Sequence, residues 1–316
     1  YSEKNNKFCE SHDLNFSNCN LLGNGDIIKT NDEEILNLKK TYGDINLIFA
    51  GFPCQGFSNA GKKLPDDPRN TLFIEFLRVT NLLKPKYIIG ENVKGLLSRK
   101  TESNEKYIDI IKSEFEKIGY KINYKVMKCN KYNIPQKRER LIIVGIKDSN
   151  QEYIFPEEIE SKPNLKNIVT FNMEGTIKIK PDNPNYEVIK NIPDECILTN
   201  MDNDENENKP HPNLKLLATD IDYKYKGKTY PKRLSFGKRD SSIHGEIIDI
   251  RNPSKTIICT YARQPRLFVP IKNKNGYFLR TLLPDELKQI QGFPLEYQIA
   301  GGINDQIIQI GNAVPP

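Results

Sequence analysis

The first 150 residues alternate short apolar runs with longer segments of helical periodicity. Residues 45–50 form an apolar run that ends in Gly51 and Pro53, which is typical of a buried strand. Residues 71–83 place apolar side chains every three to four positions and stop at Lys84-Pro85, which predicts an amphipathic helix. The same pattern predicts a second helix over 104–118 and strands over 87–89, 122–127 and 141–144. Strands separated by helices indicate a mostly parallel sheet with helices on both faces.

The pattern changes after about residue 148. Residues 151–250 contain few clear periods and many prolines, and the polar run at 201–210 predicts an exposed loop. Lysines and arginines interleave with aromatic residues over 223–239. Apolar runs return from Ser254, with a helix predicted over 284–290. We therefore expect a smaller, irregular region inserted before a final ordered segment.

Composition excludes several classes of protein. With 316 residues, 37% of them hydrophobic, the chain is long enough to bury a core. No run approaches the roughly 18 apolar residues that a membrane span needs. Six cysteines without a C-x-x-C pair argue against a zinc ribbon or disulfide framework, and favour a reducing compartment. The three histidines show no metal-ligand spacing, so we expect no metal. The net charge of +6 permits a polyanionic partner without requiring one.

Chemically capable side chains follow or open the predicted strands. Cys54 lies in a loop shaped by proline and glycine directly after a strand, where ligands bind in open α/β sheets. Alone, such a cysteine is either an exposed nucleophile or a buried small hydrophobe. Glu91 closes the next strand, and alternation places Arg138 and Arg140 on one face of another. A thiol, a carboxylic acid and two guanidiniums therefore converge at one edge of the sheet.

These motifs resemble those of the DNA (cytosine-5) methyltransferases, over nearly the whole chain. The motifs stand in the family's order: the loop 51–58, Glu91-Asn92-Val93, Gln136-x-Arg138-x-Arg140, Gln291-Gly292-Phe293-Pro294 and Gly311-Asn312-Ala313-Val314. The resemblance implies an α/β fold, with a Rossmann-like S-adenosylmethionine-dependent methyltransferase sheet and a smaller irregular target-recognition domain. It divides the chain into a catalytic domain over 1–150, a target-recognition domain over 151–250 and a return segment over 251–316 that completes the catalytic domain.

The resemblance also implies the chemistry of the site. C5 of cytosine is a poor nucleophile until a thiolate adds to C6, which is covalent catalysis. Cys54 would be that nucleophile, Glu91 would engage N3 and the amino group, and Arg140 would engage O2. Arg138 would steady the loop or a backbone phosphate. The family reaches its target by flipping the base out of the duplex.

Cofactor and DNA contacts follow from the same resemblance. Glu3 matches the residue that binds the cofactor ribose, and Gly25-Asp26-Ile27 resembles the motif whose aspartate meets the adenine amino group, although a simple turn before a helix explains it equally well. The remaining expected cofactor contacts are Pro53, Asn312 and Val314. The expected DNA contacts are Gln55, Asn92, Gln136, Lys232, Arg233, Lys238 and Arg239. For the basic stretch, the other interpretation is a solvated loop.

One family motif is not among the 316 residues. The Phe-x-Gly-x-Gly loop should lie upstream of Glu3, and Gly23-Asn24-Gly25 lacks its third glycine. We expect the first strand with that loop, and a helix after Pro316, to lie outside this sequence. Without them, we expect weak cofactor binding and negligible methyl transfer.

The sequence thus predicts a DNA (cytosine-5-)-methyltransferase that uses S-adenosylmethionine on double-stranded DNA. We expect a monomer without membrane attachment, in the cytoplasm (or the nucleus of a eukaryote), with a cognate restriction endonuclease as partner. One alternative is the family's tRNA-methylating branch, which tends to carry Pro-Pro-Cys where this chain has Phe52-Pro53-Cys54. The other alternative is a non-catalytic DNA-binding fragment.

Overall fold

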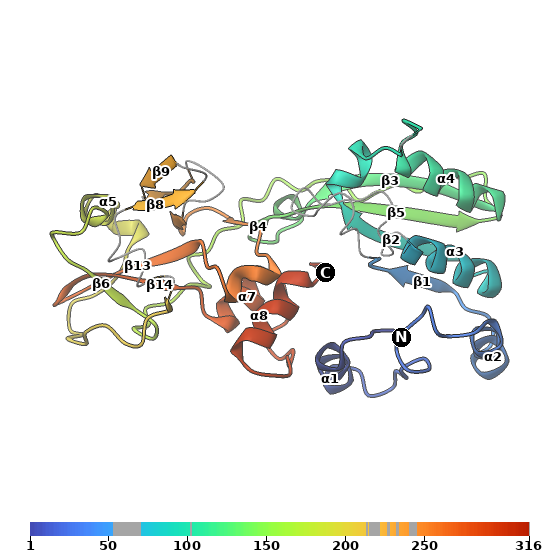
Figure 1. Ribbon diagram of the computed structural model, residues 1–316, viewed down its shortest axis with the longest axis horizontal. Helices are drawn as coiled ribbons and strands as arrows, with labels where there is room; N and C mark the ends of the chain where they lie inside the picture. The colour runs from blue at the N-terminus through green and yellow to red at the C-terminus, as the bar shows by residue number, and fades with distance from the viewer. Residues whose placement is uncertain are drawn as a thin grey trace. The chain divides into compact units, whose positions relative to one another are not determined.

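The computed structural model divides into two compact units (Figure 1). It describes residues 1–52, 71–101, 103–212, 214, 222–225, 228–231, 234–239 and 245–315. Unit 1 comprises Tyr1–Tyr132 and Arg138–Glu160, and unit 2 comprises Asn133–Lys137 and Ser161–Pro316. The three-part division by function stays a prediction.

Unit 1 is built on a four-stranded sheet of order β1-β2-β5-β3. The strands are β1 (Leu47–Ala50), β2 (Tyr87–Val93), β3 (Tyr120–Lys128) and β5 (Glu139–Lys147). β1 and β2 pair in parallel, and β5 runs antiparallel to both β2 and β3, so β1, β2 and β3 share one direction. The predicted mostly parallel sheet is therefore confirmed for three of the four strands, and β5 is the exception. The connection from β3 to β5 contains no crossover helix, and such short connections leave consecutive strands antiparallel.

The predicted helices and strands of unit 1 are confirmed, with shifted ends. Helix α3 (Thr71–Leu83) has the predicted bounds, and α4 (Tyr107–Lys117) begins three residues late because a bridge pairs Lys100 with Lys106. Every predicted strand except β1 extends further than its apolar run, so Glu91 lies inside β2 and not beyond its end. Two helices precede the sheet, α1 (Asn6–Asn15) and α2 (Asp32–Tyr42).

The core of unit 1 lies on one face of the sheet. Ile88 and Leu141 point to this face and are buried together with Phe115 of α4. The register Leu47↔Tyr87 turns Leu47 and Phe49 of β1 to the opposite face, where they are 47% and 55% exposed. Among the described residues, no helix therefore covers this face of β1, whereas the sequence predicts helices on both faces of the sheet.

Unit 2 contains a six-stranded mixed sheet and two strand pairs. The large sheet consists of β6 (Ile177–Ile179), β7 (Leu198–Asn200), β10 (Leu234–Phe236), β11 (Gly245–Ile247), β13 (Leu267–Asn273) and β14 (Gly276–Thr281). The pairs are β4 (Gln136–Lys137) with β12 (Ser254–Lys255), and β8 (Asp222–Tyr225) with β9 (Lys228–Pro231). The α-helices among its described residues include α5 (Tyr186–Lys190), α7 (Pro284–Ile290) and α8 (Ile303–Asn312). The bounds of α7 and the irregular course of 201–210 match the predictions.

A buried ion pair fixes α7 in unit 2. Arg280 of β14 donates to both carboxylate oxygens of Glu286, at 2.6 and 2.8 Å, and neither side chain is more than 5% exposed. Glu286 also accepts a hydrogen bond from the backbone N–H of Leu283, which precedes α7. The pair therefore anchors the start of the helix to the sheet.

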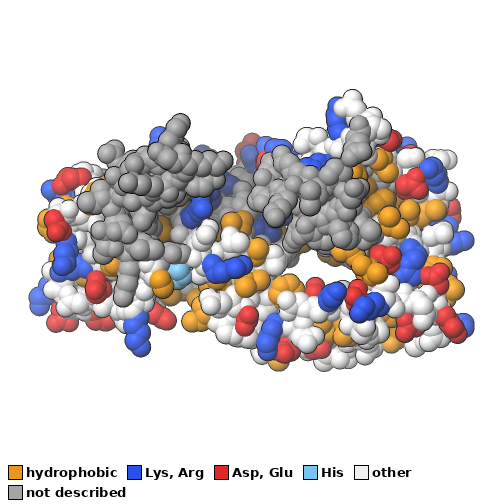
Figure 2. All heavy atoms as spheres, in the orientation of Figure 1, with side chains coloured by type: hydrophobic (Ala, Val, Ile, Leu, Met, Phe, Trp, Pro, Cys, Tyr) orange, Lys and Arg blue, Asp and Glu red, His pale blue; other side chains and the backbone are white. Residues whose placement is uncertain are grey.

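The surface carries both signs of charge. On the face in Figure 2, the described Lys and Arg side chains are interspersed with Asp and Glu, in keeping with the net charge of +6. No helix among the described residues is long and apolar enough to cross a membrane.

Candidate active site

The structure brings Glu91 and Arg140 together on adjacent strands. Glu91 pairs in register with Ile142, so Arg140, two residues away along β5, projects from the same face as a diagonal neighbour. The Arg140 Nε lies 2.7 Å from Glu91 Oε1. The two side chains are only 18% and 13% exposed, which limits screening of the pair by water. Strand alternation alone therefore builds a partly buried acid–guanidinium pair.

Burial controls the protonation of Glu91. It raises the pKa of this carboxyl above its ordinary value, although the positive charges of Arg140 and Arg138 act in the opposite direction. Arg138 is almost completely buried and stands just before β5. The site thus combines two guanidiniums with a carboxyl group that favours its acid form more than a surface glutamate does.

A second thiol, Cys129, lies within the field of these groups. Its backbone N–H donates to the carbonyl oxygen of Arg138 at 2.9 Å. The pKa of the Cys129 thiol lies above its ordinary value because the thiol is buried, although the positive charges of Arg138 and Arg140 act in the opposite direction. The sequence interpretation missed this residue; its position shortly before the Gln136–Arg140 motif was the available signal.

The segment carrying Cys54 starts beside Glu91. Cys54, Pro53 and Gln55 lie outside the described residues. Phe52 precedes them, is buried, and accepts a hydrogen bond on its carbonyl oxygen from Asn92 Nδ2 at 3.3 Å. A Cβ built on Gly51 would lie 3.9 Å from Glu91 Oε2. Asn92, predicted as a DNA contact, is itself buried, and its contact favours a role in holding Phe52, the residue before the Cys54 segment.

Gln136, another predicted DNA contact, is completely buried in unit 2. Its Nε2 donates to the side-chain oxygen of Gln291, and its Oε1 accepts from the backbone N–H of Ile257 at 3.0 Å. These bonds go to protein groups near β12 and at the end of α7. The geometry therefore favours Gln136 as a residue that positions β4.

Glu3 and Asp26, the two predicted cofactor carboxylates of unit 1, belong to segments that lie against each other. Gly25 has φ +80°, and a Cβ at this position would come within 2.2 Å of the Glu3 carbonyl oxygen, so only glycine permits the approach. Ser2 Oγ donates to the Gly25 carbonyl oxygen at 2.9 Å. Asp26 is 3.1 Å from Lys4 Nζ, which lowers the pKa of the Asp26 carboxyl and keeps it ionised.

The other predicted cofactor residues, Asn312 and Val314, lie at and after the end of α8 in unit 2. The preceding Gly311 packs on the backbone of Cys259, where a Cβ would come within 2.4 Å of the amide nitrogen. This close approach explains the glycine of the motif. Ile27 follows Asp26 in unit 1, and its carbonyl oxygen is bonded to Arg78.

The predicted DNA-contacting stretch is described in part. Lys232 and Arg233 lie outside the described residues. Lys238 is exposed, and Arg239 Nε lies 4.0 Å from Oε2 of the buried Glu246. Within the described ranges, no cluster of three or more His, Cys, Asp or Glu residues could hold a metal ion.

The chain matches known proteins over its whole length. Residues 1–316 match the family model described as C-5 cytosine-specific DNA methylase. The type II methyltransferase M.NgoFVII of Neisseria gonorrhoeae is 31% identical over an alignment 303 residues long, which covers 92% of this chain and 72% of that protein. M.DdeI of Desulfomicrobium norvegicum is 40% identical over 123 residues, which are 38% of this chain and 30% of that protein.

Solved structures give the same fold. A DNA modification methyltransferase described as encoded within an E. coli prophage aligns with a TM-score of 0.64 at 21% identity, covering 99% of this chain and 87% of that one. The DNMT2 of Spodoptera frugiperda aligns with a TM-score of 0.60 at 15% identity, covering 99% and 86%. The predicted α/β, Rossmann-like methyltransferase fold is confirmed.

Proposed function

Because the chain belongs to the C-5 cytosine-specific DNA methylase family, we propose that it methylates C5 of a flipped cytosine in double-stranded DNA through a covalent adduct of Cys54. The observation that carries the proposal is the partly buried pair of Glu91 and Arg140 beside Gly51, three residues before Cys54. The curated relatives are type II methyltransferases, which favours DNA over tRNA as substrate.

Cys54 is the proposed nucleophile. Its thiolate adds to C6 of cytosine, a C–S bond forms, and the ring electrons make C5 nucleophilic. After C5 has gained the methyl group, its proton leaves to a base, and the electron pair of that C–H bond restores the ring and expels the thiolate. The positive charges of Arg138 and Arg140 favour a thiolate over a thiol in their surroundings.

Glu91 and Arg140 stabilise the ring during the addition. Attack at C6 pushes electron density toward N3 and O2 of the base. A carboxylic acid at N3 donates a proton or a hydrogen bond, and burial raises the pKa of Glu91, which favours this acid form. The guanidinium of Arg140 suits the developing charge at O2. The 2.7 Å contact keeps both groups in register before the base arrives.

The residues of unit 1 fit one end of S-adenosylmethionine. Glu3 and Asp26 offer carboxylate acceptors for hydroxyl and amino groups, and the Gly25 approach holds their two segments together. These residues would hold the ribose and adenine, with Ile27 beside them. Asn312, Val314 and Pro53 are the proposed contacts to the remainder. When bound, the cofactor supplies an electrophilic methyl group.

The proposed partners follow from the same function. Gln55, Lys232, Arg233, Lys238 and Arg239 are proposed to contact DNA, by phosphate contacts and base-edge hydrogen bonds. We propose that the protein acts as a monomer in the cytoplasm of a bacterial cell and protects the site cut by a cognate endonuclease.

Duplex DNA containing 5-fluorocytosine tests the proposal, since the C5 fluorine cannot leave as a proton does. The full-length protein with S-adenosylmethionine should form a covalent complex that survives denaturing electrophoresis, and Cys54→Ala should not. A complex that persists in Cys54→Ala, or tritium transfer to RNA but not to DNA, would contradict the proposal.

A further inference from the structure

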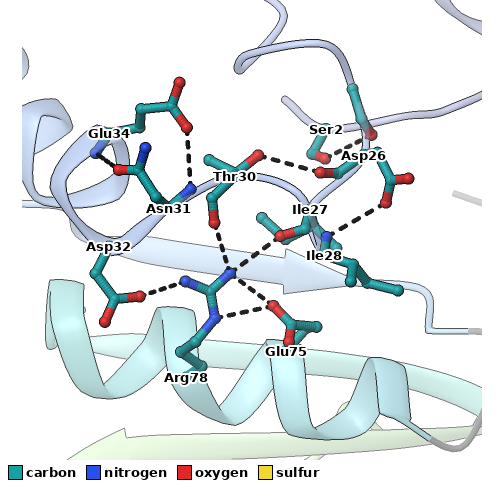
Figure 3. Close-up of polar contacts among 11 residues, drawn as sticks. Ser2, Asp26, Ile27, Ile28, Thr30, Asn31, Asp32, Glu34, Glu75 and Arg78 are labelled. Carbon is teal, nitrogen blue, oxygen red and sulfur yellow. Dashed lines mark hydrogen bonds and ion pairs between the residues drawn. The ribbon is translucent and has the colours of Figure 1, made fainter.

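Arg78 of α3 holds the loop that carries Asp26 (Figure 3). Its Nη2 donates to the backbone carbonyl oxygens of Ile27 and Thr30, both at 3.0 Å. These carbonyls lie near the two ends of the short segment between Asp26 and α2. One guanidinium nitrogen therefore fixes this segment at two points.

Two carboxylates orient the guanidinium itself. Glu75, one turn earlier on α3, accepts from Nε at 2.9 Å and from Nη2 at 2.6 Å. Asp32, the first residue of α2, accepts from Nη1. The Arg78 side chain is 25% exposed and the Glu75 side chain 16% exposed. The three nitrogens of one planar guanidinium make these contacts together, with one N–H of Nη2 shared between acceptors, whereas a lysine ammonium has a single nitrogen.

The loop passes this constraint on to Asp26. The backbone N–H of Ile28 donates to Asp26 Oδ1 at 3.3 Å, and Thr30 Oγ1 donates to the Asp26 carbonyl oxygen at 3.2 Å. Thr30 carries one of the two carbonyls that Arg78 binds, and Ile28 directly follows Ile27, which carries the other. Fixing the carbonyls of Ile27 and Thr30 thus fixes both the backbone and the carboxylate of Asp26.

We propose that Arg78 is a positioning residue for the cofactor site, which holds the Asp26 loop in the conformation that binds the adenine of S-adenosylmethionine. This inference rests on the proposed function, because it takes Asp26 as an adenine contact. Helix α3 begins directly after residues 53–70, which include Cys54. The same helix therefore anchors the cofactor loop and follows the nucleophile segment.

A positioning role and a purely structural role of Arg78 predict changes in different constants. A loop that is competent only part of the time weakens apparent affinity in proportion to its competent fraction. If loss of the clamp leaves the loop competent about a tenth of the time, the Kd for cofactor rises about tenfold. The rate at saturating cofactor and the KM for DNA stay unchanged, since Arg78 contacts neither reacting group. General destabilisation would lower the fraction of active enzyme without this split.

The test compares Arg78→Ala and Arg78→Lys with the wild type as full-length proteins. Calorimetric titration with S-adenosylhomocysteine gives Kd without turnover, and tritium transfer gives kcat and both KM values. We expect Kd and the cofactor KM to rise on the order of tenfold, with kcat and the DNA KM within about threefold. Lys117→Ala is the matched control, because it removes only an exposed contact to Glu114 on α4 and should change none of these constants.

Two results separate this inference from the function it rests on. A folded Arg78→Lys with wild-type Kd, or one in which kcat and both KM values change together, overturns the role of Arg78. This variant keeps the charge beside Glu75, so it decides the matter even where Arg78→Ala does not fold. A wild type that neither binds S-adenosylhomocysteine nor transfers a methyl group instead overturns the proposed function.

Discussion

Glu91→Gln should separate catalysis from DNA binding more sharply than any other single change at the site. Glutamine keeps the volume of the side chain and an oxygen that can accept from Arg140 Nε, which lies 2.7 Å from the carboxylate. It removes the titrating proton and replaces the ion pair by a hydrogen bond from the Arg140 guanidinium to an uncharged amide oxygen. Because Glu91 is 13% exposed, water cannot readily replace the lost proton donor. Loss of a general acid costs on the order of 10²-fold, or about 2.7 kcal/mol of barrier.

The assay is single-turnover tritium transfer to unmodified duplex DNA at saturating cofactor, with the DNA Kd measured by fluorescence anisotropy. Glu91→Gln should slow transfer about 10²-fold and change the DNA Kd less than about threefold. Glu139→Gln is the control, because Glu139 stands on the same strand next to Arg140 but pairs with Lys94 at 3.0 Å on the surface. If Glu91→Gln turns over within about threefold of the wild type, or no slower than Glu139→Gln, our placement of Glu91 at the base is wrong.

Three further predictions test the nucleophile, the acid and the framework. Cys54→Ser should abolish methyl transfer but keep DNA binding, because a hydroxyl ionises far less readily than a thiol; transfer near the wild-type rate would exclude Cys54. Burial raises the folded pKa of Glu91 above the unfolded one, so the stability that protonated Glu91 contributes is complete at low pH and lost as the pH rises through the folded pKa. In urea unfolding, Glu91→Gln should therefore gain stability relative to the wild type as the pH rises above 4.5, and a pH-independent difference would refute this. Glu286→Ala leaves Arg280 buried without its carboxylate and should cost about 3–5 kcal/mol, whereas Glu187→Ala, on an exposed pair, should cost at most about 0.5 kcal/mol; equal losses would contradict the burial argument.

Local pattern was sufficient where one segment carries the whole signal. The periodicity of 71–83 and the Lys84-Pro85 stop give α3 its bounds, and Pro284 gives the start of α7. Period-two alternation also places Arg138 and Arg140 on one face of their segment, although the pairing of β2 with β5 that brings Arg140 to Glu91 joins residues 49 positions apart. What the local pattern determines in each case lies within a few residues or along one strand.

Features that join distant segments were not predictable from one sequence. The Arg78 network joins residues 46 to 51 positions apart, and nothing in the helical pattern of α3 marks this arginine as a clamp. Gln136 looked like a DNA contact because it belongs to a functional motif, yet its amide is used by partners more than 100 residues away. The antiparallel course of β5 depends on how the chain returns from β3, which strand propensity does not encode.

The burial of Gln136 also gives the chain an order of assembly during synthesis. Gln136 accepts a hydrogen bond from the backbone N–H of Ile257, which lies 121 residues further along the chain, and donates to Gln291, which lies 155 residues further along. At about 5–20 residues per second, the ribosome needs about 6–24 s to deliver Ile257 after Gln136. During that interval β4 has no β12 to pair with, and the side-chain amide of Gln136 stays in water. Glu91 and Arg140 have both been synthesised soon after Gln136. A nascent chain can therefore form its acid–guanidinium pair well before Gln136 reaches its hydrogen-bond partners, and translation pauses within 161–256 would prolong that half-assembled state.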